Sequence, residues 1–321
     1  MTKQKIIGNQ EEKKVIDDLL KQAGQDTVID GVVKGKDVSE PAKEKSHMLN
    51  FGPFNFKACE KTRYIIMNVF NHIGYNDDGL FRYATNYDPS FTDSNAILAI
   101  DCLVFGLSFD KVKVGKKLVQ RIEDCIGFTE IDNESMLVKH ASNEGVVNLN
   151  THHNAALALA YFALGEKKNI PRLITGIERF IRFDSGLVKL GVDIPELRSY
   201  PNALLSCVYL ANGQERKASE LVSNIEKRIK FDKPTGLIRE KIGLPKPSIA
   251  GNAALALAYF GLGRGEEGSK LIKNIEEHIG FDKDNGLFRY EPGNSKAFLS
   301  VASALMALVY SAKEYYETEK K

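Results

Sequence analysis

One unit returns five times along this chain of 321 residues: a turn with an isoleucine and an aromatic residue, a Leu that usually follows a Gly, and then a helix that is apolar on nearly every side. The copies recur about every 50 residues, a period typical of repeat folds built from one supersecondary unit. One copy cannot bury its apolar helix alone, so the copies must share a core. The turns begin at Ile73, Ile126 (a degenerate copy without the Gly), Ile181, Ile229 and Ile279.

Each unit contains two helices of different character. The segment 215–229 places Leu221, Val222 and Ile225 on one stripe between charged residues, which predicts a helix with one buried and one exposed face. The segment 252–259 reads Asn-Ala-Ala-Leu-Ala-Leu-Ala-Tyr, and a helix without a polar face is buried all round. We therefore predict an all-α fold, an α/α toroid of five to six helical hairpins with the apolar helices as its inner ring. An open superhelix of the HEAT or tetratricopeptide kind is the alternative.

The domain prediction places this toroid at residues 51–321. Residues 1–50 are expected to hold a short amphipathic helix over 10–24, ended by Gly24, and a polar connector. The connections inside the toroid differ in length. Links from inner to outer helices are tight, whereas links from outer to inner helices run to roughly 15–25 residues and gather at one end, where long loops make a binding face.

Charge and composition exclude several classes of partner. With 44 Lys and Arg against 42 Asp and Glu, the chain has no basic stripe for nucleic acid. Residues 1–20 lack the apolar core of a signal peptide, and no apolar run reaches the roughly 18 residues of a membrane span. The four cysteines are scattered and are expected to be small buried hydrophobes. We expect a cytoplasmic protein without membrane or nucleic-acid partners, whose ligand is a small molecule or oligosaccharide.

The turn Phe231–Ile238 and the Asp-Ser-Asn-Ala sequence at 93–96, which precedes an Ala- and Leu-rich helix, are similar to segments of the six-hairpin (α/α)-barrel glycosidase and epimerase superfamily. The resemblance covers about residues 59–312 and concerns repeat and architecture. It implies an enzyme acting on sugars, such as a glycoside or unsaturated-uronyl hydrolase or a sugar 2-epimerase. The chain departs from it in showing five clear hairpins, so either the helix at 10–24 completes the ring or the barrel is incomplete.

Residues that recur in every copy are explained by the scaffold. The turn aspartates accept backbone N–H bonds and the turn glycines take positive φ, while the recurring Asn is interpreted as a cap or an amide that tethers a loop. The segment 282–286 resembles a calcium loop only in part, because the liganding Glu is absent. The recurring residues are Asp184, Asp232 and Asp282, Gly186, Gly236 and Gly286, and Asn95, Asn154, Asn202 and Asn252.

Residues that break the pattern are candidates for function. Two positions before the recurring Asn, the copies read Asp93, His152, Tyr200, Ala250 and Val301. We expect Asp93 to be a general acid or base whose pKa is raised toward neutrality by partial burial. The alternative is a helix cap within residues 92–94.

His152 and His153 suit proton transfer because imidazole titrates near pH 7. Adjacent residues on a helix point about 100° apart, so at most one of the two should face the lumen. A metal-binding pair on a helix has i, i+4 spacing, so no metal and no cofactor are expected. The alternative for His152 is a polar residue at the start of a helix.

Aromatic and arginine residues of the long loops predict substrate contacts. Aromatic faces stack on sugar rings and Arg forks bind carboxylates, a combination that favours an anionic or uronic glycan. The alternative for Arg82 and Arg289 is pairing with the turn aspartates. The substrate-binding candidates are Arg82, Tyr83, Tyr87, Asp88, His153, Arg198, Tyr200, Arg239, Arg289 and Tyr290.

These residues predict a carbohydrate-active enzyme, in first place a glycoside hydrolase that uses Asp93. A mechanism with two carboxylates needs a second acid, for which Glu196 and Asp88 are candidates. A sugar epimerase with His152 as its base is the first alternative. A non-catalytic toroid that binds a ligand is the second, and the absence of tryptophan favours it. An isoprenoid enzyme would need an Asp-rich diphosphate motif, which the sequence lacks.

Overall fold

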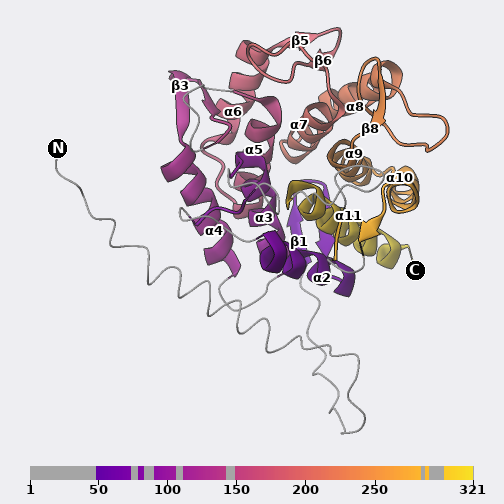
Figure 1. Ribbon diagram of the computed structural model, residues 1–321. Coiled ribbons are helices and arrows are strands. Elements are labelled where there is room, and N and C mark those ends of the chain that lie inside the picture. Colours follow the sequence, from indigo (N-terminus) through magenta and orange to yellow (C-terminus); the bar gives the residue numbers. More distant parts are fainter. Residues whose placement is uncertain are drawn as a thin grey trace, which may run out of the picture.

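The computed structural model describes residues 48–73, 79–82, 90–105, 111–141, 149–282, 286–288 and 300–320, which form an inner and an outer ring of helices (Figure 1). The helix predicted at 10–24 lies outside these residues. The inner helices are α3 (Thr92–Phe105), α5 (Thr151–Leu164), α7 (Ser199–Ala211), α9 (Ile249–Gly261) and α11 (Ser300–Glu319). The outer helices are α2 (Glu60–Asn68), α4 (Lys111–Arg121), α6 (Ile170–Gly176), α8 (Glu215–Asn224) and α10 (Gly265–His278). The first four outer helices continue into π-helical turns, η1 (Val69–Ile73), η2 (Ile122–Ile126), η3 (Ile177–Ile181) and η4 (Ile225–Ile229).

The inner ring closes on itself. Each inner helix packs against the next one along the chain, and α11 packs against both α9 and α3. The first outer helix, α2, also packs on α11. Within the described residues, five helical hairpins therefore complete the ring without the segment 10–24. The predicted toroid is confirmed, and the open superhelix and the incomplete barrel are wrong.

The turns between outer and inner helices contain small antiparallel hairpins, which the sequence analysis described only as turns. Their glycines take positive φ, 80° at Gly186 and 65° at Gly236 and Gly286, which is the conformation that favours glycine. The Asp232 carboxylate accepts the backbone N–H of Thr235 at 3.3 Å, so the prediction of turn chemistry is confirmed there. The hairpins pair β3 (Phe128–Asp132) with β4 (Ser135–Val138), β5 (Phe183–Asp184) with β6 (Leu187–Val188), β7 (Arg239–Lys241) with β8 (Leu244–Pro247), and β9 (Phe281–Asp282) with β10 (Leu287–Phe288).

The recurring asparagine ties each turn to its inner helix. The Asn202 amide oxygen accepts the backbone N–H of Val188 at 2.7 Å, and its nitrogen donates to the carbonyls of Val188 at 2.9 Å and Arg198 at 2.8 Å. The interpretation as a loop-tethering amide is confirmed. Asn95, Asn154 and Asn252 bind Phe81, Val138 and Ile238 in the same way, and Ser303 accepts from Phe288.

A buried tyrosine joins inner to outer helix in four of the units. Tyr209 donates to the Glu178 carboxylate at 2.8 Å. In the first unit the two equivalent positions hold Cys102 and Phe70, so both polar partners are replaced together by apolar or weakly polar side chains. The other three pairs are Tyr161 with Glu123, Tyr259 with Glu226, and Tyr310 with Glu276.

Removing one of these hydroxyls is expected to destabilise the protein moderately. Tyr209→Phe should lower the free energy of unfolding by about 1.5 kcal/mol, the lower end for a hydrogen bond to a charged group, because Glu178 keeps its ion pair with Lys217 at 2.7 Å. Urea unfolding followed by circular dichroism measures the change. Tyr315→Phe serves as the control, because the Tyr315 hydroxyl makes no hydrogen bond among the described residues. Equal stability of the two variants would contradict the prediction.

A fifth β-hairpin, formed by β1 (Met48–Phe51) and β2 (Phe54–Lys57), lies across the end of the ring where the inner helices finish (Figure 1). It packs against α3, α5 and α11, its Gly52 lies against the Ala211 backbone of α7, and Phe54 lies against Gly261 of α9. A Cβ on Gly52 would stand 2.8 Å from Ala211 Cα, so only glycine fits. The hairpin covers this end, and the opposite end, where the inner helices begin, is called the mouth.

Two expectations from composition can be compared with the structure. Cys102 and Cys207 are buried, Cys59 and Cys125 are half-buried, and none of the four forms a disulfide. None of the helices that the structure describes combines the length and apolar character needed to cross a bilayer.

Candidate functional site

Three successive inner helices place their pattern-breaking residue at the same point of the mouth. Asp93, His152 and Tyr200 are each the second residue of their helix, in α3, α5 and α7. The Tyr200 hydroxyl donates to Asp93 Oδ2 at 3.1 Å, and the centroids of the Tyr200 and His152 rings are 5.3 Å apart. The structure therefore brings together three residues that span 107 positions of the chain, from Asp93 to Tyr200.

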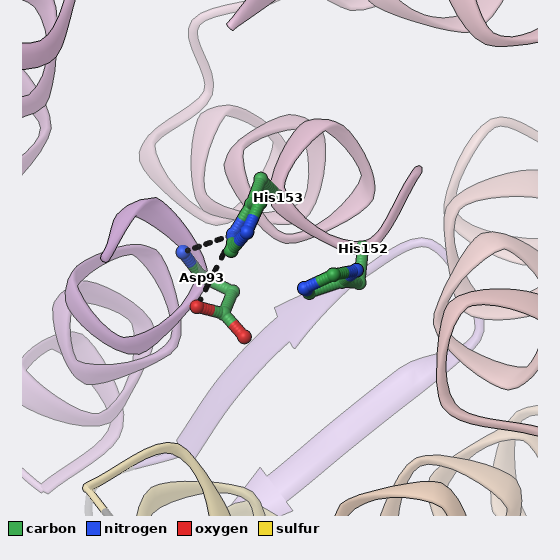
Figure 2. A group of neighbouring side chains, drawn as sticks. All are labelled: Asp93, His152 and His153. Atoms are coloured by element: carbon green, nitrogen blue, oxygen red, sulfur yellow. Dashed lines mark hydrogen bonds and ion pairs between the residues drawn. The ribbon is translucent and has the colours of Figure 1, made fainter. Parts of the chain in front are cut away.

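Asp93 is almost entirely buried, with 2% of its surface exposed. Its Oδ1 lies 3.2 Å from His153 Nδ1 and accepts the backbone N–H of Ser94 at 2.9 Å (Figure 2). Asp93 lies inside the first turn of α3, and its carboxylate serves side chains from α5 and α7. Asp93 therefore has contacts of both kinds: it accepts a backbone N–H at the start of α3, and it contacts the two neighbouring inner helices.

The charge state of Asp93 differs from the expectation. Burial by itself would raise the pKa of Asp93, but the charge interaction and hydrogen bond with His153, together with His152 and His140, lower that pKa well below its ordinary value. The predicted rise toward neutrality is wrong because it considered burial without these partners. At physiological pH the carboxylate is ionised and suits the role of a base, a nucleophile or an anionic stabiliser.

His153 is completely buried and lies between two polar neighbours. Its Nδ1 faces Asp93, and its Nε2 contacts His140 Nδ1. The His140 ring in turn stacks near Phe91, with ring centroids 4.1 Å apart. Asp93 of α3, His153 of α5 and His140 after β4 thus form a continuous chain of polar contacts. The sequence analysis missed His140, although three of the six histidines of this chain fall between 140 and 153.

His152 is half-buried, and its ring points toward the Asp93 carboxylate (Figure 2). Its Nδ1 is buried without a hydrogen-bond partner. Burial, followed by repulsion from His153, lowers the pKa of His152 well below its ordinary value, and the same two causes lower the pKa of His140 to about 4. Both imidazoles are therefore neutral at pH 7, and each has a nitrogen lone pair that can bind a metal ion or accept a hydrogen bond.

The loop before α7 carries an ion-pair network. Arg198 donates to Glu196 at 2.7 Å and to Glu240 at 3.0 Å, and Lys241 pairs with Glu196 at 3.0 Å. The hydrogen bonds from Arg198 and Lys241 hold the pKa of Glu196 below its ordinary value. Glu196 is therefore ionised and paired with two cations, which disfavours it as the second catalytic acid. The Arg198 fork, predicted to bind a substrate carboxylate, is already occupied by two carboxylates.

Hydroxyl groups at the first residue of the same three inner helices hold the next loop in place. Thr92 donates to the Lys139 carbonyl at 2.8 Å, and Thr151 donates to the Lys189 carbonyl at 2.6 Å. The Ser199 hydroxyl donates to the Glu240 carbonyl at 3.2 Å. These bonds fix the loops around the polar side of the mouth.

The remaining candidates are less defined by the structure. Arg82 follows Phe81, whose backbone is held by Asn95, and Arg239 begins β7. The other predicted substrate contacts, Tyr83, Tyr87, Asp88, Arg289 and Tyr290, lie outside the described residues.

No protein-family model and no curated protein matches the sequence. The structure is similar to a glycoside hydrolase family 76 α-mannanase from Bacteroides thetaiotaomicron, with a TM-score of 0.55 and 14% identity over 98% of this chain and 99% of that one. It is also similar to a D-mannose isomerase, with a TM-score of 0.53 and 10% identity over 94% and 98%. A sugar epimerase from a ruminal bacterium gives a TM-score of 0.50 and 15% identity over 81% and 86%.

The chain has an α/α-barrel fold like that of these three proteins. At identities of 10 to 15% the likeness establishes this fold, and the chemistry of the barrel has to be derived from its own residues.

The barrel contains one more polar residue that breaks the repeat, and the sequence analysis missed it. Asp101 of α3 is completely buried, and both carboxylate oxygens lack a hydrogen-bond partner. Burial raises its pKa well above the ordinary value. Comparison of the copies beyond the helix N-termini would have found it, because its counterparts are Ala160, Val208, Ala258 and Val309.

Proposed function

We propose that this α/α barrel is a carbohydrate-active enzyme whose reaction takes place at the mouth formed by α3, α5 and α7. The observation that carries the proposal is the convergence of an ionised carboxylate, a neutral imidazole and a phenol, from Asp93, His152 and Tyr200. Perturbed titratable groups that meet at one end of a barrel are typical of an active site. The structural neighbours, a mannanase, a mannose isomerase and a sugar epimerase, support sugars as the substrate class.

Glycoside hydrolysis is the first candidate reaction. An ionised Asp93 can act as the base that activates water or as the nucleophile, and the second group would be a protonated acid on the other side of the glycosidic bond. Glu196 is disfavoured in that role by its ion pairs. Asp88, the other predicted acid, lies outside the described residues and stays a candidate.

Epimerisation or isomerisation of a sugar is the second candidate, and a specific observation favours it. His152 is neutral, lies beside the ionised Asp93 and has a ring nitrogen without a partner. A neutral imidazole can remove the proton next to a sugar carbonyl, and proton transfer is the role that histidine most often has in catalysis.

The two reactions are separated by their products. Purified protein is incubated in D2O with manno-oligosaccharides, uronic-acid oligosaccharides and free mannose. Hydrolysis creates new reducing ends, whereas isomerisation changes the sugar, places deuterium on carbon and creates no new ends. We expect Asp93→Asn to lower turnover at least about a hundredfold, the scale of an acid–base group.

The matched control is Asp184→Asn, which removes an exposed carboxylate from the turn of β5 and β6 and should keep full activity. A hydrolase should retain part of its activity in His152→Ala, whereas an epimerase should lose it. If no sugar in the panel is converted and none raises the melting temperature, the proposed function is wrong.

A further inference from the structure

We propose that Asp93, His152 and His153 bind a divalent transition-metal ion at the mouth of the barrel. One carboxylate oxygen and one ring nitrogen of each histidine lie within 4.8 Å of one another. Two histidines and one carboxylate leave coordination positions open for a ligand, as in non-heme iron and related centres. The inference stands on ligand geometry and does not depend on the proposed sugar reaction.

The sequence analysis expected no metal because it considered the spacing of the histidines along one helix. The donors come from two helices, α3 and α5, which pack against each other. The side chains of His152 and His153 both reach the space beside Asp93 (Figure 2). Asp93 of α3 would complete the ligand set with the two adjacent histidines of α5, so the site does not need two histidines at i, i+4 spacing on one helix.

The distance between Asp93 and His153 suits two ligands of one ion. Two bonds of about 2.1 Å at angles of 90° to 110° span about 3.0–3.4 Å, and the observed separation of Asp93 Oδ1 from His153 Nδ1 is 3.2 Å. The His152 ring is directed at the same carboxylate (Figure 2).

Hydrogen bonding around His153 Nδ1 gives a second, independent argument. The backbone N–H of Asp93 points at this nitrogen at 3.3 Å, which requires a lone pair there. The same nitrogen faces the Asp93 carboxylate at 3.2 Å, so two electron-rich atoms lie side by side. A proton on Nδ1 would satisfy the carboxylate but turn two donors toward each other. A cation between Nδ1 and the carboxylate resolves the conflict.

The surroundings also resemble the outer shell of a metal centre. His153 Nε2 contacts His140, and Asp93 Oδ2 accepts from Tyr200; such partners orient metal-bound imidazoles and carboxylates. His152 Nδ1 is buried without a hydrogen-bond partner. The cluster thus combines partnered ligands with a histidine ring that still has one unpartnered nitrogen.

The test is a titration of EDTA-treated, dialysed protein with Co2+, followed by its visible absorption, and with Zn2+ by calorimetry, without any sugar. We expect one equivalent of metal to bind, and His152→Gln to weaken binding at least tenfold, since even the loss of an outer-shell partner costs about 10- to 100-fold. The half-buried His152 is chosen because its replacement disturbs the core least, and circular dichroism confirms folding. His278→Gln removes an exposed histidine from α10 and should bind metal like the parent.

Absence of a cobalt band in the parent protein, or equal affinity in His152→Gln, would overturn the inference. The cluster would then be a metal-free hydrogen-bonded chain from Asp93 to His140. The outcome is separate from that of the sugar assays. Metal binding without conversion of any sugar would support this inference and contradict the proposed function. Conversion of a sugar without metal binding would support the proposed function and contradict this inference.

Discussion

Asp101→Val is expected to stabilise the folded protein at neutral pH. The Asp101 carboxyl is completely buried without a hydrogen-bond partner, so the folded state holds it in the protonated form while the unfolded chain ionises it. Valine fits the position, since Val208 and Val309 occupy it in other units. The gain should be about 1.4 kcal/mol for each pH unit above about pH 4, until the folded pKa is reached.

The sign of the pH dependence follows from the raised pKa of Asp101. Above about pH 4, where an unfolded aspartate loses its proton, the folded protein binds more protons than the unfolded chain, so stability falls as pH rises. Asp101→Val should lack this slope. The lowered pKa of Asp93 acts in the opposite sense only below about pH 4. The lowered pKa values of His140 and His152 act in the opposite sense up to about pH 6.5, but equally in the parent and in Asp101→Val, so the difference between the two profiles isolates Asp101.

Urea unfolding at several pH values between 5 and 7 measures both effects. Asp184→Asn, at an exposed turn position, is the control and should follow the parent curve. Parallel stability profiles for the parent and Asp101→Val would show that Asp101 is ionised or solvated in the folded protein, contrary to this account.

Asn202→Ala is expected to be the most damaging of the scaffold substitutions. Its amide makes three hydrogen bonds with the backbone of Val188 and Arg198. Alanine leaves one N–H and two carbonyls without that partner, at about 1–3 kcal/mol for each buried group. We expect a loss of about 3–6 kcal/mol, limited by any water that enters.

Thermal and urea unfolding check this value against two variants. Asn202→Ser should lose less, because Ser303 carries the same bond to the turn in the fifth unit. Asn212→Ala, at an exposed position after α7, should be almost neutral. If Asn202→Ala and Asn212→Ala are equally stable, the tether contributes nothing.

Much of the fold could be predicted because each unit contains two helices with different hydrophobic periodicity. The stripe of Leu221, Val222 and Ile225 and the unbroken apolar run of 252–259 define outer and inner helices without reference to the rest of the chain. The number of hairpins in the ring could not be predicted, because closure depends on how neighbouring inner helices pack. Strands as short as β1 and β2 have too few residues to show a periodicity.

The site was predictable only in part. Asp93, His152 and Tyr200 could be found because the repeat gives them one register position, and the structure brings these three together. The charge of Asp93 could not be predicted, because its pKa depends on His153 and His140, which approach it from another helix and from a loop. His140 has no counterpart in the repeat that would single it out.

Closure of the ring also has a consequence for the synthesis of the chain. The carbonyl of Lys57 accepts the hydroxyl of Ser311 at 2.7 Å, and α2 packs on α11, so the start of the barrel is completed by its end. Until α11 has been synthesised, the apolar surfaces of β2 and α2 that pack on α11 remain exposed, and such surface favours aggregation. A nascent or truncated chain that stops before residue 300 is therefore expected to have an unclosed ring with exposed apolar surface, and to need protection from aggregation until α11 has been added.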